Sequence, residues 1–267
     1  MLQINNFQLK QFYEKCQKDK LIGIDTEFYR VDTYYPKLCL IQLSNTDECM
    51  VIDPIENNLE MDFLRKILFN TKIKKVLHAA RQDIEIFYNI FKKIPMPIYD
   101  TQIALLALGF PHSTSYATAC RDLLQIKIDK KNQFIDWRKR PLNYNKIAYA
   151  INDVKFLLPL FHKINKEMEL KNTNVLKPHY KKIINIDIYS KRAENAWEKI
   201  KFNNYKDIDL NKLKKICFIR EKLAMKKNVP IKQIISNSDI KILSKKNIKK
   251  KNEEKILMKL KVGSINL

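Results

Sequence analysis

The feature that most constrains the fold is a series of short apolar runs, each of strand length and each followed by a turn or a charged residue. Residues 21–25 (LIGID) predict a buried strand, and residues 38–44 (LCLIQLS) predict its hairpin partner, with Tyr34-Tyr35-Pro36 in the turn. Further strands are predicted at residues 50–53, 75–78 and 97–100. The chain therefore begins as a sheet of short strands.

Helical patterns follow these strands along the chain. In residues 79–91 the apolar side chains Ile84, Phe87 and Phe91 recur at the three- and four-residue spacing of an amphipathic helix. Other helices are predicted at residues 62–69, 102–108, 118–124 and 143–161. Short strands mixed with helices predict an α/β fold. A length of 267 residues suggests one larger domain and a smaller one.

The chain is strongly basic, with 51 Lys and Arg against 29 Asp and Glu, a formal charge of +22. Such a charge attracts polyanions, although only three glycines among many Lys, Ile and Asn also fit a compositional bias of the coding sequence. Residues 1–160 carry 23 basic and 18 acidic side chains, whereas residues 161–267 carry 28 and 11. This asymmetry favours a nucleic-acid contact in the C-terminal part.

Cysteine usage and hydropathy indicate the compartment. Five scattered cysteines with no C-x-x-C pair indicate neither a disulfide framework nor a zinc site, so we expect no disulfide partner. The N-terminus lacks the apolar run of a signal peptide, and no segment approaches the ~20 apolar residues of a membrane span. We therefore expect a cytoplasmic protein that does not bind to a membrane.

Two carboxylates end the first predicted strand, Asp25 and Glu27 in I-D-T-E. Period-two alternation directs both side chains to one face of the sheet. Carboxylate oxygens are the ligands that Mg²⁺ prefers, and such a pair suits phosphodiester cleavage. D-x-E alone is a weak signal, because acidic residues end many strands by chance.

Two later segments add acidic residues at helical positions. Asp83 lies in an early helical turn, where the helix dipole alone would favour a carboxylate. Tyr149 and Asp153 are four residues apart and share one helix face, which an ordinary solvated surface would also explain. Each fragment is ambiguous by itself. Together they follow a fixed order: D-x-E on a strand, Asp on the following helix, and Y-x-x-x-D on a later helix.

This order resembles the DEDD exonuclease superfamily in its tyrosine-bearing branch. Four segments within residues 25–142 resemble the ribonuclease D family in particular: DTEFYRVDTYYPKLCLIQL, VLHAARQDIEIF, IYDTQIA and DWRKRPL. The resemblance covers about residues 15–165. It implies a ribonuclease-H-like fold, a mixed sheet flanked by helices with the acidic site at its edge.

The resemblance also implies the chemistry of the site. Asp25, Glu27, Asp83 and Asp153 would bind two divalent metal ions, Mg²⁺ or Mn²⁺, and Tyr149 would orient or deprotonate the attacking water. A phenol with a reference pKa near 10 is a poor base at neutral pH, so Tyr149 is assigned mainly to positioning.

Four further residues are candidates for substrate binding: Phe28, His78, Lys131 and Trp137. Phe28 could stack on a terminal base or fill the core, and His78 could contact substrate or make a structural hydrogen bond. Lys131 and Trp137 lie where the family has a substrate-side loop. Asp100 is predicted to be structural, and Arg81 is left out of the predicted site.

The C-terminal segment resembles the helicase-and-ribonuclease-D C-terminal (HRDC) domain, a small helical module. The resemblance rests on residues 195–200 (NAWEKI), on residues 213–221 and on residues 228–231 (NVPI). A basic helical tail that packs on the catalytic domain is the alternative. We therefore predict an exonuclease domain at residues 1–195 and a reduced HRDC-like helical domain at residues 205–267.

The function implied is a 3′-5′ exoribonuclease that hydrolyses RNA 3′ ends to 5′-mononucleotides by a two-metal-ion mechanism. The expected partners are single-stranded RNA 3′ ends, tRNA precursors or other structured RNA among them. Two alternatives stay open: a DNA-directed 3′-5′ exonuclease, because the same carboxylates cut either backbone, and a catalytically idle RNA-binding protein.

Overall fold

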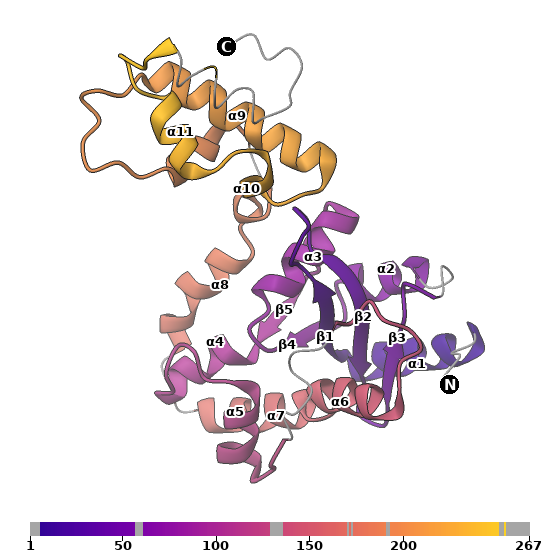
Figure 1. The fold of residues 1–267 in the computed structure, drawn as a ribbon. Helices are drawn as coiled ribbons and strands as arrows, with labels where there is room; N and C mark the ends of the chain where they lie inside the picture. The colour runs from indigo at the N-terminus through magenta and orange to yellow at the C-terminus, as the bar shows by residue number, and fades with distance from the viewer. Residues whose placement is uncertain are drawn as a thin grey trace. The chain divides into compact units, whose positions relative to one another are not determined.

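The computed structural model describes residues 6–56, 61–128, 136–169, 171, 173–190, 193–250 and 254. The chain packs as two units (Figure 1). The first unit comprises Met1–Tyr29 and Lys37–Tyr189, and the second comprises Arg30–Pro36 and Ser190–Leu267. Across the described residues, no helix has the length and apolarity needed to cross a bilayer.

The first unit is built on a five-stranded sheet of order β3-β2-β1-β4-β5. Its strands are β1 (Leu21–Tyr29), β2 (Lys37–Ser44), β3 (Cys49–Ile52), β4 (Lys74–Leu77) and β5 (Ile98–Asp100). β1 and β2 form the predicted antiparallel hairpin, β3 pairs antiparallel with β2, and β4 and β5 continue the sheet in parallel from β1. The predicted α/β class with a mixed sheet is confirmed.

Helices cover both faces of the sheet (Figure 1). One face carries α1 (Asn6–Asp19), α2 (Met61–Phe69) and α3 (Arg81–Phe91), and the other carries α6 (Tyr144–Lys155) and α7 (Leu157–Met168). Ile22 and Ile24 of β1 pack in the core of the α1–α3 face. The alternate residues of β1 therefore face α6 and α7.

Gly23 allows α7 to lie close to the sheet. A Cβ atom at this position would lie 2.2 Å from Ser44 Oγ and 3.3 Å from Leu157 Cβ. The first contact would require the Ser44 hydroxyl to move, and the second would require Leu157 to shift by a few tenths of an ångström, so a side chain at position 23 would loosen the packing of α7 on the sheet. This close packing holds α6 and α7 against the end of β1.

The single helix predicted at residues 143–161 is wrong, because the structure ends α6 at Lys155 and starts α7 at Leu157. Phe156 has non-helical dihedrals, φ −106° and ψ 5°, and its N–H donates to Tyr116 Oη at 3.1 Å. The physical reason is Pro159, whose ring has no N–H for a helical bond and clashes with the carbonyl of residue 155. Apolar spacing alone did not reveal this break.

The remaining described elements of the first unit surround the C-terminal end of the parallel strands. They are α4 (Thr101–Leu105), η2 (Leu106–Leu108), α5 (Tyr116–Leu124), η3 (Thr173–Leu176), α8 (Lys177–Ile183) and η4 (Ile186–Ile188). Asp100 caps α4 and also accepts hydrogen bonds from the N–H groups of Ala79 and Ala80. Its predicted structural role is confirmed.

The second unit is a small helical module. Its helices are η5 (Ala193–Lys199), α9 (Leu210–Lys227), α10 (Ile231–Ile234) and α11 (Asn237–Leu243). Their buried apolar faces share one core that includes Ile208, Leu213 and Ile240. The predicted helical C-terminal portion is present.

The hairpin loop Arg30–Pro36 belongs to the second unit, although β1 and β2 on either side of it belong to the first. Tyr34 Oη donates to Glu221 Oε1 of α9 at 2.6 Å, and the Tyr35 N–H donates to Asn228 Oδ1 at 3.0 Å. Glu221 is buried, so the hydroxyl of Tyr34 supplies one of its carboxylate oxygens with a partner. The bond between Tyr34 and Glu221 joins residues 187 positions apart in the sequence, and it was not predicted.

Candidate active site

Asp25 and Glu27 lie near the C-terminal end of β1, on the face that α6 covers. Asp25 pairs in register with Gln42 of β2 and Glu27 pairs with Leu40, and a β-bulge follows Glu27. Two residues of one strand that are two positions apart point to the same face. The strand therefore directs both carboxylates toward α6, as the sequence predicts.

Asp83 reaches the same strand end from the opposite layer. It lies in the first turn of α3, is buried, and accepts a hydrogen bond from Thr26 Oγ1 at 2.5 Å. Burial raises the pKa of Asp83 to about 7, against the effect of the Thr26 hydrogen bond, which lowers it. Thr26 was not predicted as part of the site, because its role depends on a contact with α3, 57 positions along the chain.

Asp153 and Tyr149 lie one turn apart on α6, and the Tyr149 hydroxyl donates to the Asp153 carboxylate. Burial raises the pKa of Asp153 to about 7, although this hydrogen bond lowers it. Ser44 of β2 donates to the Val154 carbonyl at 3.0 Å. That bond fixes the turn that carries Asp153 against the sheet.

These four residues, Asp25, Glu27, Asp83 and Asp153, form the carboxylate cluster. Burial and the charges of Asp83, Asp153 and Glu27 raise the pKa of Asp25 well above its usual value. Burial and the charges of Asp153 and Asp83 raise the pKa of Glu27 to about 8. Among the described residues, no lysine or arginine is a main cause of these pKa shifts. Within the described part of the chain, the cluster thus holds like charges without a cationic side chain that offsets them.

The same charges act on Tyr149. Burial and the negative charges of Asp153, Glu27 and Asp25 raise the pKa of its phenol well above its usual value. The hydroxyl therefore stays protonated at neutral pH and is available as a hydrogen-bond donor, not as a base.

The donor chemistry of the cluster fits a hard divalent cation. All four side chains offer oxygen, and a cation would relieve the repulsion that helps to raise the pKa values of Asp25 and Glu27. Within the ranges that the structure describes, no three His, Cys, Asp or Glu side chains already converge tightly enough to hold a metal ion.

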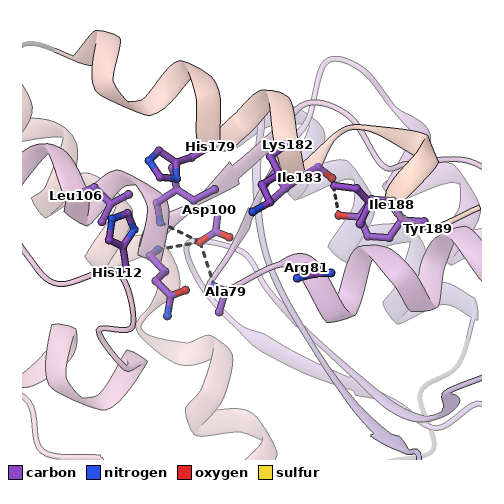
Figure 2. A pocket seen from close by; sticks show the side chains of 12 residues that line it. Ala79, Arg81, Asp100, Leu106, His112, His179, Lys182, Ile183, Ile188 and Tyr189 are labelled. Carbon is purple, nitrogen blue, oxygen red and sulfur yellow. Dashed lines mark hydrogen bonds between the residues drawn. The ribbon is translucent and has the colours of Figure 1, made fainter. Parts of the chain in front are cut away.

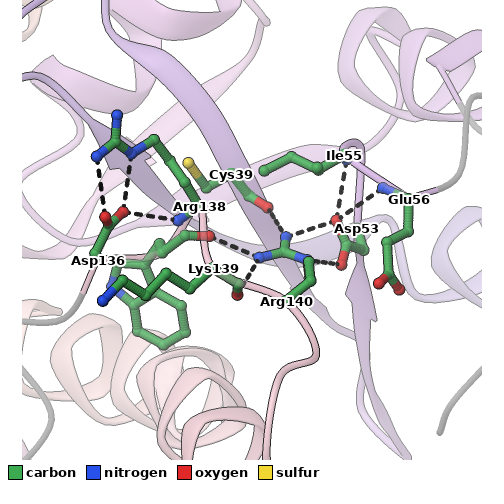
Figure 3. A network of polar contacts seen from close by, with 9 residues as sticks. Cys39, Asp53, Ile55, Glu56, Asp136, Arg138, Lys139 and Arg140 are labelled. Carbon is green, nitrogen blue, oxygen red and sulfur yellow. Dashed lines mark hydrogen bonds and ion pairs between the residues drawn. The ribbon is translucent and has the colours of Figure 1, made fainter.

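A second group of charges fixes the segment that begins at Asp136 (Figure 3). We call Asp53, Asp136, Arg138 and Arg140 the arginine network. Arg140 forms a two-pronged ion pair with Asp53, at 2.6 and 2.7 Å, and donates to the Cys39 carbonyl at 3.0 Å. It also donates to the Trp137 carbonyl at 2.7 Å. The segment is thereby bound to β2 and to the end of β3.

The arginine network determines where Trp137 lies. The indole of Trp137 is 3% exposed and packs with Leu40, Val51 and Ala150. Its ring centroid lies 6.0 Å from that of Tyr149, at an interplanar angle of 33°. Arg140 thus acts on Tyr149 through the placement of Trp137.

Arg138 occupies the exposed side of the same segment. Its guanidinium pairs with both oxygens of Asp136, at 3.0 and 2.9 Å (Figure 3). It also lies 3.4 Å from the ring centroid of Tyr29. Hydrogen bonds from Arg138 lower the pKa of Asp136 to about 2. In contrast to the carboxylate cluster, this carboxylate has a dedicated cation.

The four predicted substrate-binding residues occupy different environments. Phe28 is partly buried and packs against the core of the α1–α3 face, and Trp137 is buried. The ring nitrogens of His78 lie 2.9 Å from Thr101 Oγ1 and 3.0 Å from the Thr114 carbonyl, which matches the structural alternative. Lys131 lies outside the described residues. A substrate contact by any of them stays a prediction.

A sequence profile described as 3′-5′ exonuclease matches residues 4–169, which contain every residue of the carboxylate cluster. The chain belongs to the 3′-5′ exonuclease family. The match also covers Tyr149 and the arginine network.

Curated members of the family resemble the chain over most of its length. Ribonuclease D of Sphingobium indicum is 35% identical over 234 residues, which are 87% of this chain and 60% of the relative. Ribonuclease D of Bartonella henselae is 37% identical over 217 residues, 81% of this chain and 53% of the relative. The chain thus spans somewhat over half the length of these relatives.

A solved structure of the family has the same architecture. Escherichia coli RNase D, described as an exoribonuclease involved in structured RNA processing, superposes with a TM-score of 0.77 at 27% identity, over 90% of this chain and 64% of that chain. The exonuclease fold is therefore the ribonuclease-H-like mixed sheet that the sequence predicts.

Proposed function

We propose that this family member is a 3′-5′ exoribonuclease of the ribonuclease D kind, releasing 5′-mononucleotides from RNA 3′ ends. The observation that carries the proposal is the carboxylate cluster beside a protonated tyrosine: burial raises the pKa of all four acids, and neighbouring carboxylates raise those of Asp25 and Glu27 further. Like charges buried without a cation destabilise a fold, so a ligand must supply the compensation. Resemblance to ribonuclease D supports RNA as the substrate.

Asp25, Glu27, Asp83 and Asp153 would hold two divalent ions, Mg²⁺ or Mn²⁺. Such ions, when bound, lower the pKa of water and neutralise charge on the phosphate being cleaved. Thr26 fixes the Asp83 carboxylate by its hydrogen bond, and Ser44 fixes the turn of Asp153. The protein's own contribution is to hold these oxygens in a partly buried, water-poor place.

Tyr149 orients the water that attacks the terminal phosphodiester. Because its hydroxyl keeps its proton, it donates to Asp153 or to a phosphate oxygen and does not take the proton of the water. Trp137 packs beside its ring and limits its rotation. Tyr149 is thus a donor held in a fixed orientation.

The second unit supplies affinity for RNA in this proposal, as a reduced HRDC-like domain. Its helices share one apolar core, and residues 161–267 carry most of the basic excess of the chain. Lysine and arginine contacts to phosphates release counterions, so binding should weaken as salt rises. Precursors of tRNA and other structured RNA are the proposed substrates.

The decisive experiment uses purified protein with RNA labelled at its 5′ or 3′ end, a matched DNA, and a circular RNA, each in Mg²⁺, Mn²⁺ or EDTA. We expect metal-dependent release of mononucleotides from the linear RNA 3′ end. Asp62→Asn, which changes a carboxylate at the start of α2, is the matched control for substitutions in the cluster.

Each other outcome identifies a different function. Equal or faster degradation of the DNA would favour a DNA-directed exonuclease. Cleavage of the circular RNA would exclude an exonuclease that requires an end. Tight RNA binding without cleavage in either metal would leave an RNA-binding protein without catalysis.

A further inference from the structure

The first unit also contains a basic site, apart from the carboxylate cluster. It is a cavity of about 200 Å³ between the turn before α3, the start of α4, and α8 with the segment after it (Figure 2). Its polar lining comes mainly from Arg81, His112, His179 and Lys182. All of its lining residues belong to the first unit, so the cavity lies within that unit alone.

The two cationic side chains of this cavity, Arg81 and Lys182, have no acidic partner in the part of the chain that the structure describes. Among the described residues, neither Arg81 nor Lys182 forms an ion pair, whereas Arg138 and Arg140 do. His112 and His179 lie with their ring centroids 5.2 Å apart. Even a neutral histidine offers one N–H, so the group provides donors on several sides of one small space.

One acid, Asp100, lines the cavity, but backbone N–H groups already donate hydrogen bonds to its carboxylate oxygens. Its oxygens accept the N–H groups of Ala79 at 3.0 Å, Gln102 at 2.8 Å and Ile103 at 3.3 Å (Figure 2). The N–H of Ala80 also donates to Asp100, at 2.8 Å. These dipoles offset its negative charge. Asp100 therefore shapes the cavity without supplying a counterion to Arg81 or Lys182.

The backbone at this place supports a specific role. Ala79 has φ +57°, the left-handed region that non-glycine residues rarely adopt, and it is held there by its hydrogen bond to Asp100. Such conformations persist where surrounding structure over-determines them, and they cluster at ligand sites. The turn places Arg81 at the start of α3, on the cavity.

The ligand class follows from size and charge. The cavity is smaller than the ~300–1,000 Å³ typical of pockets for small organic molecules, so it suits a compact group. Arginine, lysine and histidine donors match a phosphate, and the apolar side chains of Ile183 and Ile188 suit an adjoining sugar. We propose that this cavity binds a phosphate group of the RNA, upstream of the 3′ end that is being cleaved.

The link to cleavage rests on the proposed function. Arg81 and Asp83 lie two positions apart in the first turn of α3, so the cavity and the carboxylate cluster are separated by on the order of one helix diameter, ~10 Å. An RNA strand with its last phosphodiester at the cluster can therefore place an earlier phosphate in the cavity. This site would hold the strand while successive nucleotides are removed.

The first test observes the cavity directly, without any cleavage. The chain contains only four histidines, so the imidazole signals of histidine-labelled protein can be assigned and followed by NMR at fixed pH in EDTA. Inorganic phosphate is added first, and then a short RNA of phosphorothioate backbone. We expect saturable shifts of the His112 and His179 signals with both ligands, with RNA acting at lower concentration, while His162 of α7 does not move.

Exposed-residue variants then connect the cavity to RNA affinity. The double variant R81Q/K182Q should weaken RNA binding roughly tenfold, as expected when charge-assisted hydrogen bonds are lost. It should also flatten the salt dependence by about 0.7 in log-log slope for each phosphate contact removed. The matched control is R65Q/K181Q, which removes a guanidinium of α2 and the neighbouring ammonium of α8, neither of them in the cavity.

The outcomes separate this inference from the proposed function. If wild-type protein cleaves RNA but His112 and His179 do not respond, or R65Q/K181Q weakens binding as much as R81Q/K182Q, the cavity is not a phosphate site. If no RNA is cleaved but the two histidines shift saturably with phosphate and the double variant abolishes the shift, the phosphate site stands and the exoribonuclease proposal fails. Phosphate shifts without RNA shifts would assign the cavity to a free phosphate compound and overturn its role in RNA binding.

Discussion

The carboxylate cluster and the arginine network are charged regions of one unit, built on opposite electrostatic plans. In the arginine network each carboxylate has a guanidinium, as in the Asp53–Arg140 pair. In the carboxylate cluster Asp25 and Glu27 have only other carboxylates and burial to raise their pKa values. The network therefore balances its charges within the protein, whereas in the proposed function the cluster is completed by bound cations.

The contrast teaches that pairing separates structural charges from functional ones in this molecule. The fold tolerates the repulsion within the cluster because the rest of the unit, with its layered core, holds the strand end and α6 in place. Five predictions test this division: three concern activity and pairing, in order of decreasing effect, and the last two concern the stability of the metal-free protein.

The largest effect is expected from the cluster itself. Replacement of Asp25, Asp83 or Asp153 by Asn should lower kcat/KM at least about 100-fold, because each removes a charge that compensates a cation. The measurement is mononucleotide release from labelled RNA, with circular dichroism to establish that each variant is folded. Near wild-type activity in any one of these variants would remove that residue from the site.

Tyr149→Phe should lower kcat by roughly 10- to 100-fold while leaving RNA affinity nearly unchanged, because one donor to the reacting groups is lost and the ring remains. Single-turnover kinetics and equilibrium binding measure the two quantities separately. If binding weakens as much as turnover, the hydroxyl acts in holding the ground-state RNA.

Arg140→Lys should destabilise the protein by about 1–3 kcal/mol, since lysine keeps the charge but loses the fork that binds Asp53 and two carbonyls. It should also lower kcat a few-fold through displacement of Trp137 and Tyr149. Urea unfolding gives the stability, and Arg138→Lys on the exposed side of the segment is the control. Equal losses from both substitutions would contradict a special role for Arg140.

The smallest effect concerns the stability of the metal-free protein and its pH dependence. Glu27, with a pKa of about 8 against a usual 4.5, and Asp83 and Asp153, with pKa values of about 7 against 3.8, bind more protons when folded than when unfolded. Folding should therefore be favoured as pH falls from about 8 towards 4, and lost as pH rises. In EDTA, the melting temperature should be a few degrees higher at pH 6 than at pH 8, and Mg²⁺ should reduce this difference.

Asp83→Asn should raise the melting temperature of the metal-free protein, because it removes a buried like charge and keeps an acceptor for Thr26. The same variant loses activity, so stability and function change in opposite directions. A lower melting temperature in EDTA would mean that the Asp83 charge is structural.

The sequence predicts the strand-borne part of the site well. Asp25 and Glu27 follow from alternation along one strand, and Tyr149 with Asp153 from spacing along one helix, both of which are local geometry. The mixed sheet follows likewise from short apolar runs. The break at Phe156 was missed because Pro159 lies in the first turn of the next helix, where proline is tolerated and hence gives a weak signal.

What stayed hidden depends on contacts between distant parts of the chain. Arg81, His112, His179 and Lys182 have no mutual spacing that could suggest a common cavity, and Arg81 was left out of the predicted site. The Asp53–Arg140 pair joins positions 87 apart. No periodicity reports such pairs, because they follow from the completed fold.

The placement of the hairpin loop Arg30–Pro36 in the second unit has a consequence for inheritance. The chain crosses between the units after Tyr29, after Pro36 and again after Tyr189. Recombination at a single junction after Tyr189 would therefore leave the first unit attached to the loop Arg30–Pro36, which packs with the second unit. Tyr34 of that loop would then lack the Glu221 carboxylate as an acceptor. Conversely, the helical half alone would have a gap where that loop belongs. The two units are thus bound to evolve as a pair, and shuffling of this C-terminal module among exonucleases requires matched changes in the loop.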